Sequence, residues 1–172
     1  MGELETVKFY GVNGRLIRFR NFAGKPGQYN MEGDRNFCLL LAPEDADALQ
    51  KDGYNVRYLR PRDESEEPQP YIQIKVAYRN RRGESKRPPK IVQITSHGKT
   101  TLNEETITNL DWADIEKADI AINPHPYDNV NGRSGIKAYL KTMYVTIAED
   151  DFESRYLDVP DSAQNITDED AF

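Results

Sequence analysis

The stretch from Gly135 to Ile147 reads GIKAYLKTMYVTI and predicts one long β-strand. Apolar and polar side chains alternate along it with the period of two that is typical of a half-buried strand. The inward positions are even-numbered at first and odd-numbered from residue 143 onward, the set being Ile136, Ala138, Leu140, Met143, Val145 and Ile147. A change of parity needs one extra residue in the strand, so we expect a β-bulge near Thr142.

Six further stretches are rich in β-branched and aromatic residues that alternate with polar ones. They are Arg15–Phe22, Asn36–Leu41, Asn55–Leu59, Tyr71–Tyr78, Lys90–Thr95 and Ala118–Asn123. The Asn131-Gly132 dipeptide between the last two predicted strands is a typical hairpin turn. Helix signals are confined to Pro43–Lys51, which has Pro and acids in its first turn, and to Asn103–Leu110, where Asn103 can cap.

Many short strands, few helices and no strand–helix repeat predict a mainly β protein, an OB-fold-like small β-barrel with one or two short helices. The strand count exceeds the five of an OB fold, so we expect an extra β-hairpin around the basic loop Arg79–Pro89. Residues 1–147 then form one domain. Residues 148–172 form an acidic C-terminal tail that we expect to be disordered, because acids, Pro and Ser bury too little apolar surface to offset the entropy of ordering.

The charge of the chain is unevenly distributed. The formal net charge is −6, but residues 148–172 hold nine acidic side chains against one basic, which leaves 22 basic and 20 acidic residues in the body. From Tyr54 to Lys99 there are eleven basic residues against five acidic ones. An acidic average therefore does not exclude a nucleic-acid partner, because cations are concentrated in one region.

Three predicted strands combine cations with aromatic residues on the side turned away from the core. On the first of them we expect Ile17 and Phe19 to face inward and Phe22 outward. The outward set over the three strands is Arg18, Arg20, Phe22, Tyr71, Lys75, Arg79, Lys137, Tyr139 and Lys141. The basic loop adds Arg81, Arg82, Lys86 and Arg87. Unpaired bases stack on aromatic rings while cations follow the phosphates, so the pattern favours a groove for single-stranded nucleic acid. The alternative is an ordinary solvent face, because Tyr is also a good strand former.

Enzymatic chemistry has little support in the sequence. No phosphate-binding or dinucleotide-binding glycine motif is present, and two histidines (His97 and His125) with one cysteine, Cys38, do not form a zinc motif. We therefore expect no enzyme activity, no metal and no cofactor. The remaining enzymatic alternative is a metal-dependent nuclease, with carboxylates from Asp111, Asp114, Glu116 and Asp119. Trp112, beside these acids, is expected to pack in the core.

The compartment follows from what the chain lacks. No apolar run approaches the length of a membrane helix and no secretory signal precedes residue 8. The single cysteine cannot form an internal disulfide, so we expect a protein of the reducing cytoplasm without a membrane partner.

The chain ends in acids followed by an aromatic residue: Asp168, Glu169, Asp170, Ala171 and Phe172. A terminal Phe with its carboxylate can enter an apolar pocket rimmed by cations, which makes the tail a candidate for binding protein partners. The same acids could compete with DNA for the basic groove. The alternative is a tail that only keeps the protein soluble.

The stretch from Ile17 to Gly24, the pair Asn36-Phe37, the stretch from Gly135 to Val145 and the acidic end with Phe172 together resemble phage-encoded single-stranded DNA-binding proteins. The resemblance implies an OB fold and sequence-independent binding of single-stranded DNA in replication, recombination or repair in the host cell cytoplasm. It also implies a tail that recruits replication or recombination proteins. A β-barrel adaptor that binds proteins and no nucleic acid stays open as an alternative, as does a homo-oligomeric state.

Overall fold

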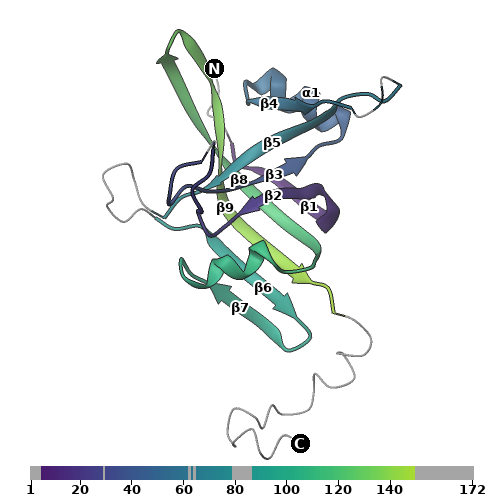
Figure 1. Ribbon diagram of the computed structural model, residues 1–172, viewed down its shortest axis with the longest axis vertical. Coiled ribbons are helices and arrows are strands. Elements are labelled where there is room, and N and C mark those ends of the chain that lie inside the picture. The colour runs from purple at the N-terminus through teal and green to yellow at the C-terminus, as the bar shows by residue number, and fades with distance from the viewer. Residues whose placement is uncertain (1–4, 29, 62, 64, 79–86, 150–172) are drawn as a thin grey trace, which may run out of the picture.

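The computed structural model describes residues 5–149 except 29, 62, 64 and 79–86, and its architecture is a single curved sheet (Figure 1). The strands are β1 (Val7–Asn13), β2 (Ile17–Asn21), β3 (Arg35–Leu40), β4 (Val56–Leu59), β5 (Gln69–Val76), β6 (Lys90–Thr95), β7 (Gly98–Leu102), β8 (Ile115–Val130) and β9 (Arg133–Ile147). The main path runs β1-β8-β9-β5-β3-β2 and does not close, with β4 added to β5 and β6 and β7 added beside β9. This open nine-stranded sheet is consistent with the small OB-like β fold that the sequence predicts.

The long strand β9 organises the sheet. One edge of it pairs with β8 in an antiparallel hairpin, and the other edge pairs in parallel first with β5, through Ala138 and Tyr139, and then with β6, from Thr142 to Thr146. Opposite Ala121 and Ile122, β9 places Thr142 and Leu140, so Lys141 is the extra residue of a bulge. The β-bulge predicted near Thr142 is confirmed, and it lets both halves of β9 turn their apolar side chains inward.

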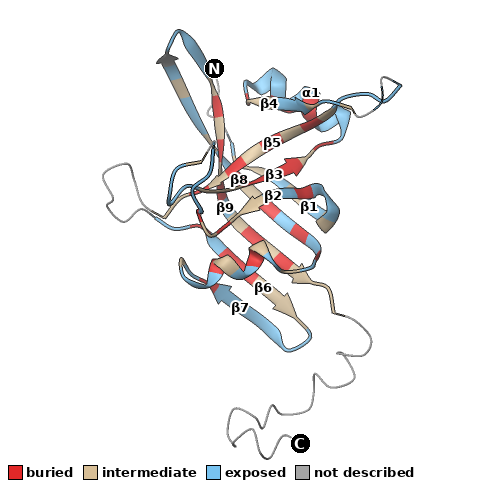
Figure 2. Ribbon diagram, in the orientation of Figure 1, coloured by how far each residue is buried: buried red, intermediate tan, exposed pale blue. Residues whose placement is uncertain are grey.

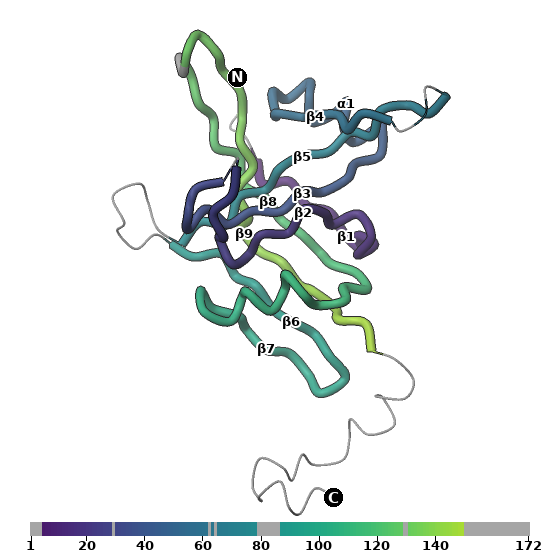
Figure 3. Tube along the Cα trace, in the orientation of Figure 1, coloured from purple at the N-terminus to yellow at the C-terminus, as the bar shows by residue number. Residues whose placement is uncertain are grey.

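The hairpin at the end of β8 and β9 extends away from the rest of the fold (Figure 3). Its turn residues Asn131 and Gly132 have φ angles of 57° and 74°, as a two-residue type I′ turn requires. The predicted hairpin is confirmed, although β8 is longer at both ends than the Ala118–Asn123 prediction.

The prediction of an extra hairpin around the basic loop is wrong. Strands β5 and β6 flank that loop, but they are not paired with each other, because both use the same edge of β9 at successive positions. The hairpins beyond an OB barrel are instead β6–β7 and the outer end of β8–β9. Strands β1 and β7 were not predicted, since Lys8, Tyr10 and the GKTTL of β7 dilute the apolar alternation.

Short helices connect several of the strands. Helix α1 (Pro43–Asp52) starts with Pro, carries acids in its first turn and ends at Gly53, whose φ of 103° suits glycine, so the predicted helix is confirmed. The second predicted helix is the 3-10 helix η2 (Thr106–Asp111), and Asn103 accepts hydrogen bonds from the backbone N–H groups of Glu105 and Thr106. A 3-10 turn, η1 (Gly14–Leu16), joins β1 to β2.

Buried residues alternate with more exposed ones along several strands (Figure 2), so one side of the sheet forms the core. Strand β5 alternates without exception, with Ile72, Ile74 and Val76 buried and their neighbours partly exposed. On β9 the predicted positions Ile136, Ala138, Leu140, Met143 and Val145 are buried, and Ile147, also predicted, is partly buried against the core. No helix in the described part of the chain is both long and apolar enough to cross a membrane.

Candidate nucleic-acid interface

Strand register brings predicted site residues from different parts of the sequence onto one side of the sheet. Lys75 of β5 is the Cα partner of Asn36 on β3 and of Tyr139 on β9, and Asn36 pairs in turn with Asn21 on β2. Directly paired residues of neighbouring strands point to the same side. Tyr139, Lys75, Asn36 and Asn21 therefore form one row across four strands, on the side opposite the core.

A second row runs beside the first and contains Arg18, Cys38 and Gln73. We call this side of the sheet the outer face and define it by Arg18, Phe19, Asn21, Asn36, Cys38, Tyr71, Gln73, Lys75, Lys137 and Tyr139. Five of the residues predicted for the groove lie on it: Arg18, Tyr71, Lys75, Lys137 and Tyr139.

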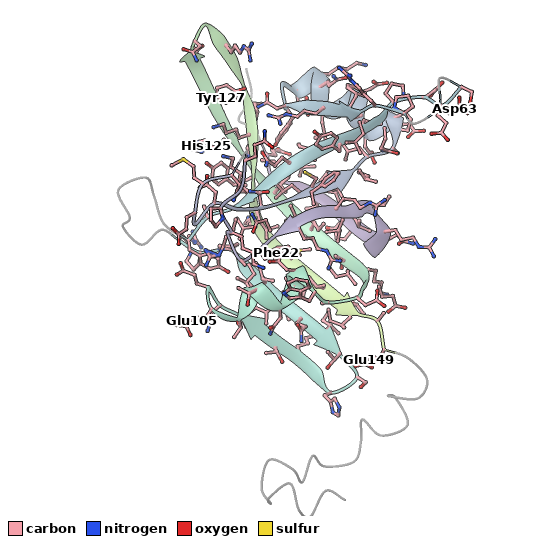
Figure 4. All side chains as sticks on the ribbon, viewed as in Figure 1. Phe22, Asp63, Glu105, His125, Tyr127 and Glu149 are labelled. Carbon is pink, nitrogen blue, oxygen red and sulfur yellow. The ribbon has the colours of Figure 1, made fainter. Side chains whose placement is uncertain are left out.

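Aromatic rings and cations alternate where β8 and β9 border the outer face. The ring of Tyr139 lies 4.8 Å from that of His125, and the Lys137 ammonium lies 5.3 Å from the centre of the Tyr127 ring. His125 and Tyr127 both belong to β8 and lie along the β8–β9 hairpin (Figure 4). Neither was predicted as a site residue, because the predicted strand ended at Asn123.

The Tyr127 ring is held in place by its own contacts. Its hydroxyl and the Asn55 side-chain amide exchange hydrogen bonds of 2.9 and 3.1 Å. Gly135 of β9 is the Cα partner of Tyr127 and leaves room for this pair. A Cβ on Gly135 would lie 2.8 Å from the Tyr127 hydroxyl oxygen. A fixed ring beneath a lysine ammonium offers a planar surface and a positive charge at one place.

At the other side of the outer face, Phe19 and Phe22 exchange the roles that the sequence predicts. Phe22 is fully buried and stacks on Phe37 at 5.2 Å, whereas Phe19 is 60% exposed, with its ring 6.4 Å from Tyr71. Between Arg18 and Asn21, β2 has one residue more than β3, and Phe19 sits in this bulge with a φ of 52°. The outward placement of Phe22 and the inward placement of Phe19 are therefore wrong, because the bulge reverses the alternation.

Arg20, also predicted to face outward, is occupied by structural contacts. Its guanidinium donates hydrogen bonds to the backbone oxygens of Leu110, at 2.9 Å, and Ala113, at 2.7 Å. These bonds attach β2 to the end of η2 and to the segment that follows it. Arg20 is consequently a positioning residue beside the outer face rather than part of it.

Lys141 is the extra residue of the β9 bulge and borders a separate hollow of about 330 Å³. Strands β1, β8 and β9 line the hollow, chiefly through Thr6, Lys8, Tyr10, Asp119, Lys141, Thr142 and Tyr144. The Lys90 ammonium adds a cation 5.7 Å from the Tyr144 ring. The structure thus extends the line of cations and tyrosines along β9, but Lys141, in the bulge, borders this hollow, whose lining includes neither Lys137 nor Tyr139.

The one cysteine is not suited to covalent chemistry. Cys38 is buried between Arg18 and Gln73 in the second row. Burial raises the pKa of its thiol to about 11, and the nearby Arg57 guanidinium opposes that effect only in part. A thiol that stays protonated at neutral pH is a weak nucleophile.

Two of the four acids considered for a nuclease site have structural partners. The Asp111 carboxylate accepts the backbone N–H groups of Phe22 and Ala23, and Asp119 accepts that of Gly11. Among the residues that the structure describes, no group of three or more His, Cys, Asp or Glu side chains could hold a metal ion. The chemistry that the outer face offers is stacking, cationic attraction and hydrogen bonding.

The predicted position of Trp112 is also wrong. This residue was expected in the core, yet 79% of it is exposed at the end of η2. The one sequence signal for this exposure is that Trp112 lies in the stretch Asp111-Trp112-Ala113-Asp114, between two acids.

Several predicted residues lie outside the described ranges. These are Arg79, Arg81, Arg82 and Lys86 of the basic loop and Asp168, Glu169, Asp170 and Phe172 of the tail. Arg87, at the border of the loop, is exposed.

Comparison with known proteins connects this geometry to a family. The model of the phage ssDNA-binding domain family matches residues 3–171 of the chain. None of the curated proteins matches it in sequence. Among solved structures, it resembles the single-stranded DNA-binding protein of bacteriophage Enc34 in complex with ssDNA, with 13% identity, a TM-score of 0.53 and coverage of 84% of this chain and 88% of the other.

A C-terminally truncated form of the Enc34 protein gives 13% identity, a TM-score of 0.51 and coverage of 84% and 87%. These likenesses show a shared fold. The family match extends over nearly the whole sequence, including the part that builds the outer face. The chain therefore belongs to the family of phage single-stranded DNA-binding domains.

Proposed function

We propose that this protein binds single-stranded DNA without sequence preference on its outer face. The observation that carries the proposal is the row from Asn21 to Tyr139, which crosses four adjacent strands and pairs a lysine, Lys75, with a tyrosine, Tyr139. Bases stack on such rings for about 1–3 kcal/mol each, and lysines and arginines replace counterions along the phosphates. Both contributions are independent of base identity.

The role is stoichiometric rather than catalytic. Membership of the family supports protection and organisation of single-stranded DNA during phage replication, recombination or repair, which would take place in the host cell cytoplasm. The basic loop with Arg81, Arg82, Lys86 and Arg87 would add cations at the end of β5. The acidic tail ending in Phe172 would compete with DNA for the cationic face and recruit partner proteins.

Fluorescence anisotropy of a labelled 30-nucleotide oligo(dT), titrated at two salt concentrations, tests the proposal. We expect tight binding that weakens steeply with salt, and much weaker binding of the matching duplex, whose paired bases cannot stack on protein rings. Tyr58 provides a matched control, because this exposed tyrosine of β4 donates its hydroxyl to Gln50 of α1. Equal binding by wild type and Tyr139→Ala would contradict the assignment of the face, and no binding to any strand would favour the protein adaptor.

A further inference from the structure

Trp112 is the only tryptophan of the chain, and at 79% exposed it covers none of the core. Tryptophan is largely buried in most proteins, because burial of its large side chain removes a large apolar surface from water. An indole so exposed adds little to the free energy of folding. The exposed position of Trp112 therefore indicates a role in binding.

The backbone on both sides of Trp112 is fixed by two charged side chains. Asp111 accepts the N–H groups of Phe22, at 2.6 Å, and Ala23, at 3.0 Å, while Arg20 donates to the oxygens of Leu110 and Ala113. We call these four hydrogen bonds the bracket. Because each involves a charged group, they are stronger than ordinary backbone bonds. The indole is thus exposed from a rigid support that is tied to the fully buried Phe22 and Leu110.

A lysine lies over the exposed ring. The ammonium of Lys25 is 5.1 Å from the centre of the Trp112 ring. The backbone of Lys25 is itself held, since its N–H donates to the Asn21 side-chain oxygen and its carbonyl accepts from the side-chain amides of Asn21 and Asn30. A planar aromatic surface next to a cation has the two elements that one nucleotide of a single strand requires.

Lys25 connects this pair to the first row of the outer face. Asn21, which holds Lys25, is the end of the row that runs through Asn36 and Lys75 to Tyr139. Neighbouring strands lie about 4.8 Å apart, so the row spans roughly 14 Å from β9 to β2. Because Lys25 is bonded to Asn21 and lies over Trp112, the pair is next to the β2 end of this row.

We propose that Trp112 and Lys25 form an additional nucleotide subsite, where a base of single-stranded DNA stacks on the indole and its phosphate contacts the ammonium. The inference rests on the proposed function, because it lengthens the path of the same strand. A strand that occupies the row on the outer face reaches Trp112 only if it is long enough to continue past β2. Short oligonucleotides are therefore bound without contacting Trp112.

A single tryptophan makes the test direct, because all indole fluorescence of the full chain comes from Trp112. The protein is titrated with oligo(dT) of increasing length, and indole fluorescence is recorded together with the anisotropy of a label on the DNA. We expect the shortest bound oligonucleotides to raise anisotropy with little effect on fluorescence. Longer ones quench it in parallel with saturation, and duplex DNA does not.

Substitutions separate stacking from folding. Trp112→Ala is expected to weaken binding of long oligo(dT) about tenfold and to leave the shortest bound oligonucleotide unaffected, whereas Trp112→Phe retains most of the affinity. Tyr58→Ala is the matched control and should bind as wild type does. Circular dichroism should give the same melting transition for Trp112→Ala as for the wild type, because the bracket does not use the indole.

The outcomes distinguish this inference from the function on which it rests. Anisotropy that reports tight binding at all lengths, with unchanged indole fluorescence and unchanged affinity of Trp112→Ala, would overturn the subsite and leave the outer face intact; Trp112 would then serve a protein partner. Absence of binding at every length would overturn the proposed function and the subsite together.

Discussion

The aromatic rings of the binding surface are supported in two different ways. Around β5 and β9, Tyr71 and Tyr139 stand on regular, paired strands and are partly covered by their neighbours. At the edge formed by β2, Phe19 and Trp112 are 60% and 79% exposed, and irregular backbone holds them. Regular pairing therefore positions half-buried rings at little cost, whereas a mostly exposed ring needs a bulge or charged hydrogen bonds to fix it.

The largest expected effect concerns the bracket at the β2 edge. Asp111→Ala removes the acceptor of two backbone N–H groups, and we expect it to lower the free energy of unfolding by about 3 kcal/mol, measured by urea denaturation. Asp114→Ala, three residues along and exposed, is the control and should change stability by less than about 0.5 kcal/mol. Equal stability of the two variants would show that the edge does not depend on charged bonds.

A second prediction concerns the regular half. Tyr139→Ala should weaken oligo(dT) binding by about 2 kcal/mol, roughly 30-fold, because it removes a ring that stacks on a base. Anisotropy titration measures the change, with Tyr58→Ala as the reference. A loss of the same size in both variants would indicate a general effect on the fold rather than a contact on the outer face.

Replacing Phe19 by glycine is expected to raise the stability of the fold and to lower the affinity for DNA. An L-residue at a φ of 52° costs about 1 kcal/mol, which glycine avoids, so Phe19→Gly should raise the free energy of unfolding by up to about 1 kcal/mol. The same change removes an exposed ring and should weaken DNA binding about fivefold. Phe19→Ala, which keeps the backbone cost, should lose affinity without the gain in stability. If both variants bind as the wild type does, Phe19 is not part of the interface.

The smallest expected effect is on salt dependence. Lys137→Gln removes one cation that lies over the Tyr127 ring, so the slope of log affinity against log salt should decrease in magnitude by about 0.7. Anisotropy at four salt concentrations resolves such a change. Lys51→Gln on α1 is a control with the same charge change and should leave the slope as it is.

The regular half of the surface could be predicted from the sequence, because alternation is a local property. Ile72, Ile74 and Val76 on β5 have the predicted orientation, and the parity change on β9 correctly indicated its bulge. These strands place Tyr71, Lys75, Lys137 and Tyr139 on the outer face as expected. Other local signals predicted helix α1, through Pro43 and the acids of its first turn, and the turn at Asn131-Gly132, through its dipeptide.

The edge half could not be predicted, because it depends on contacts between segments far apart in the chain. The bulge in β2 depends on the register of β2 with β3. It also depends on hydrogen bonds from Arg20 to Leu110 and from Phe22 to Asp111, which join residues about 90 positions apart in the chain. Strict alternation over Arg15–Phe22 therefore interchanged Phe19 and Phe22. The parallel pairing of β5 and β6 with β9 is equally non-local, which is why the predicted hairpin at the basic loop was wrong.

Ultraviolet cross-linking of oligo(dT) to the full protein, followed by mass spectrometry of the cross-linked peptides, tests the central claim most directly. The account predicts cross-links at Tyr71, Tyr139 and Phe19 on the outer face and none at Tyr58, which is bonded to α1. Cross-links at Tyr58, with none on β2, β5 or β9, would contradict the assignment of single-stranded DNA to the outer face.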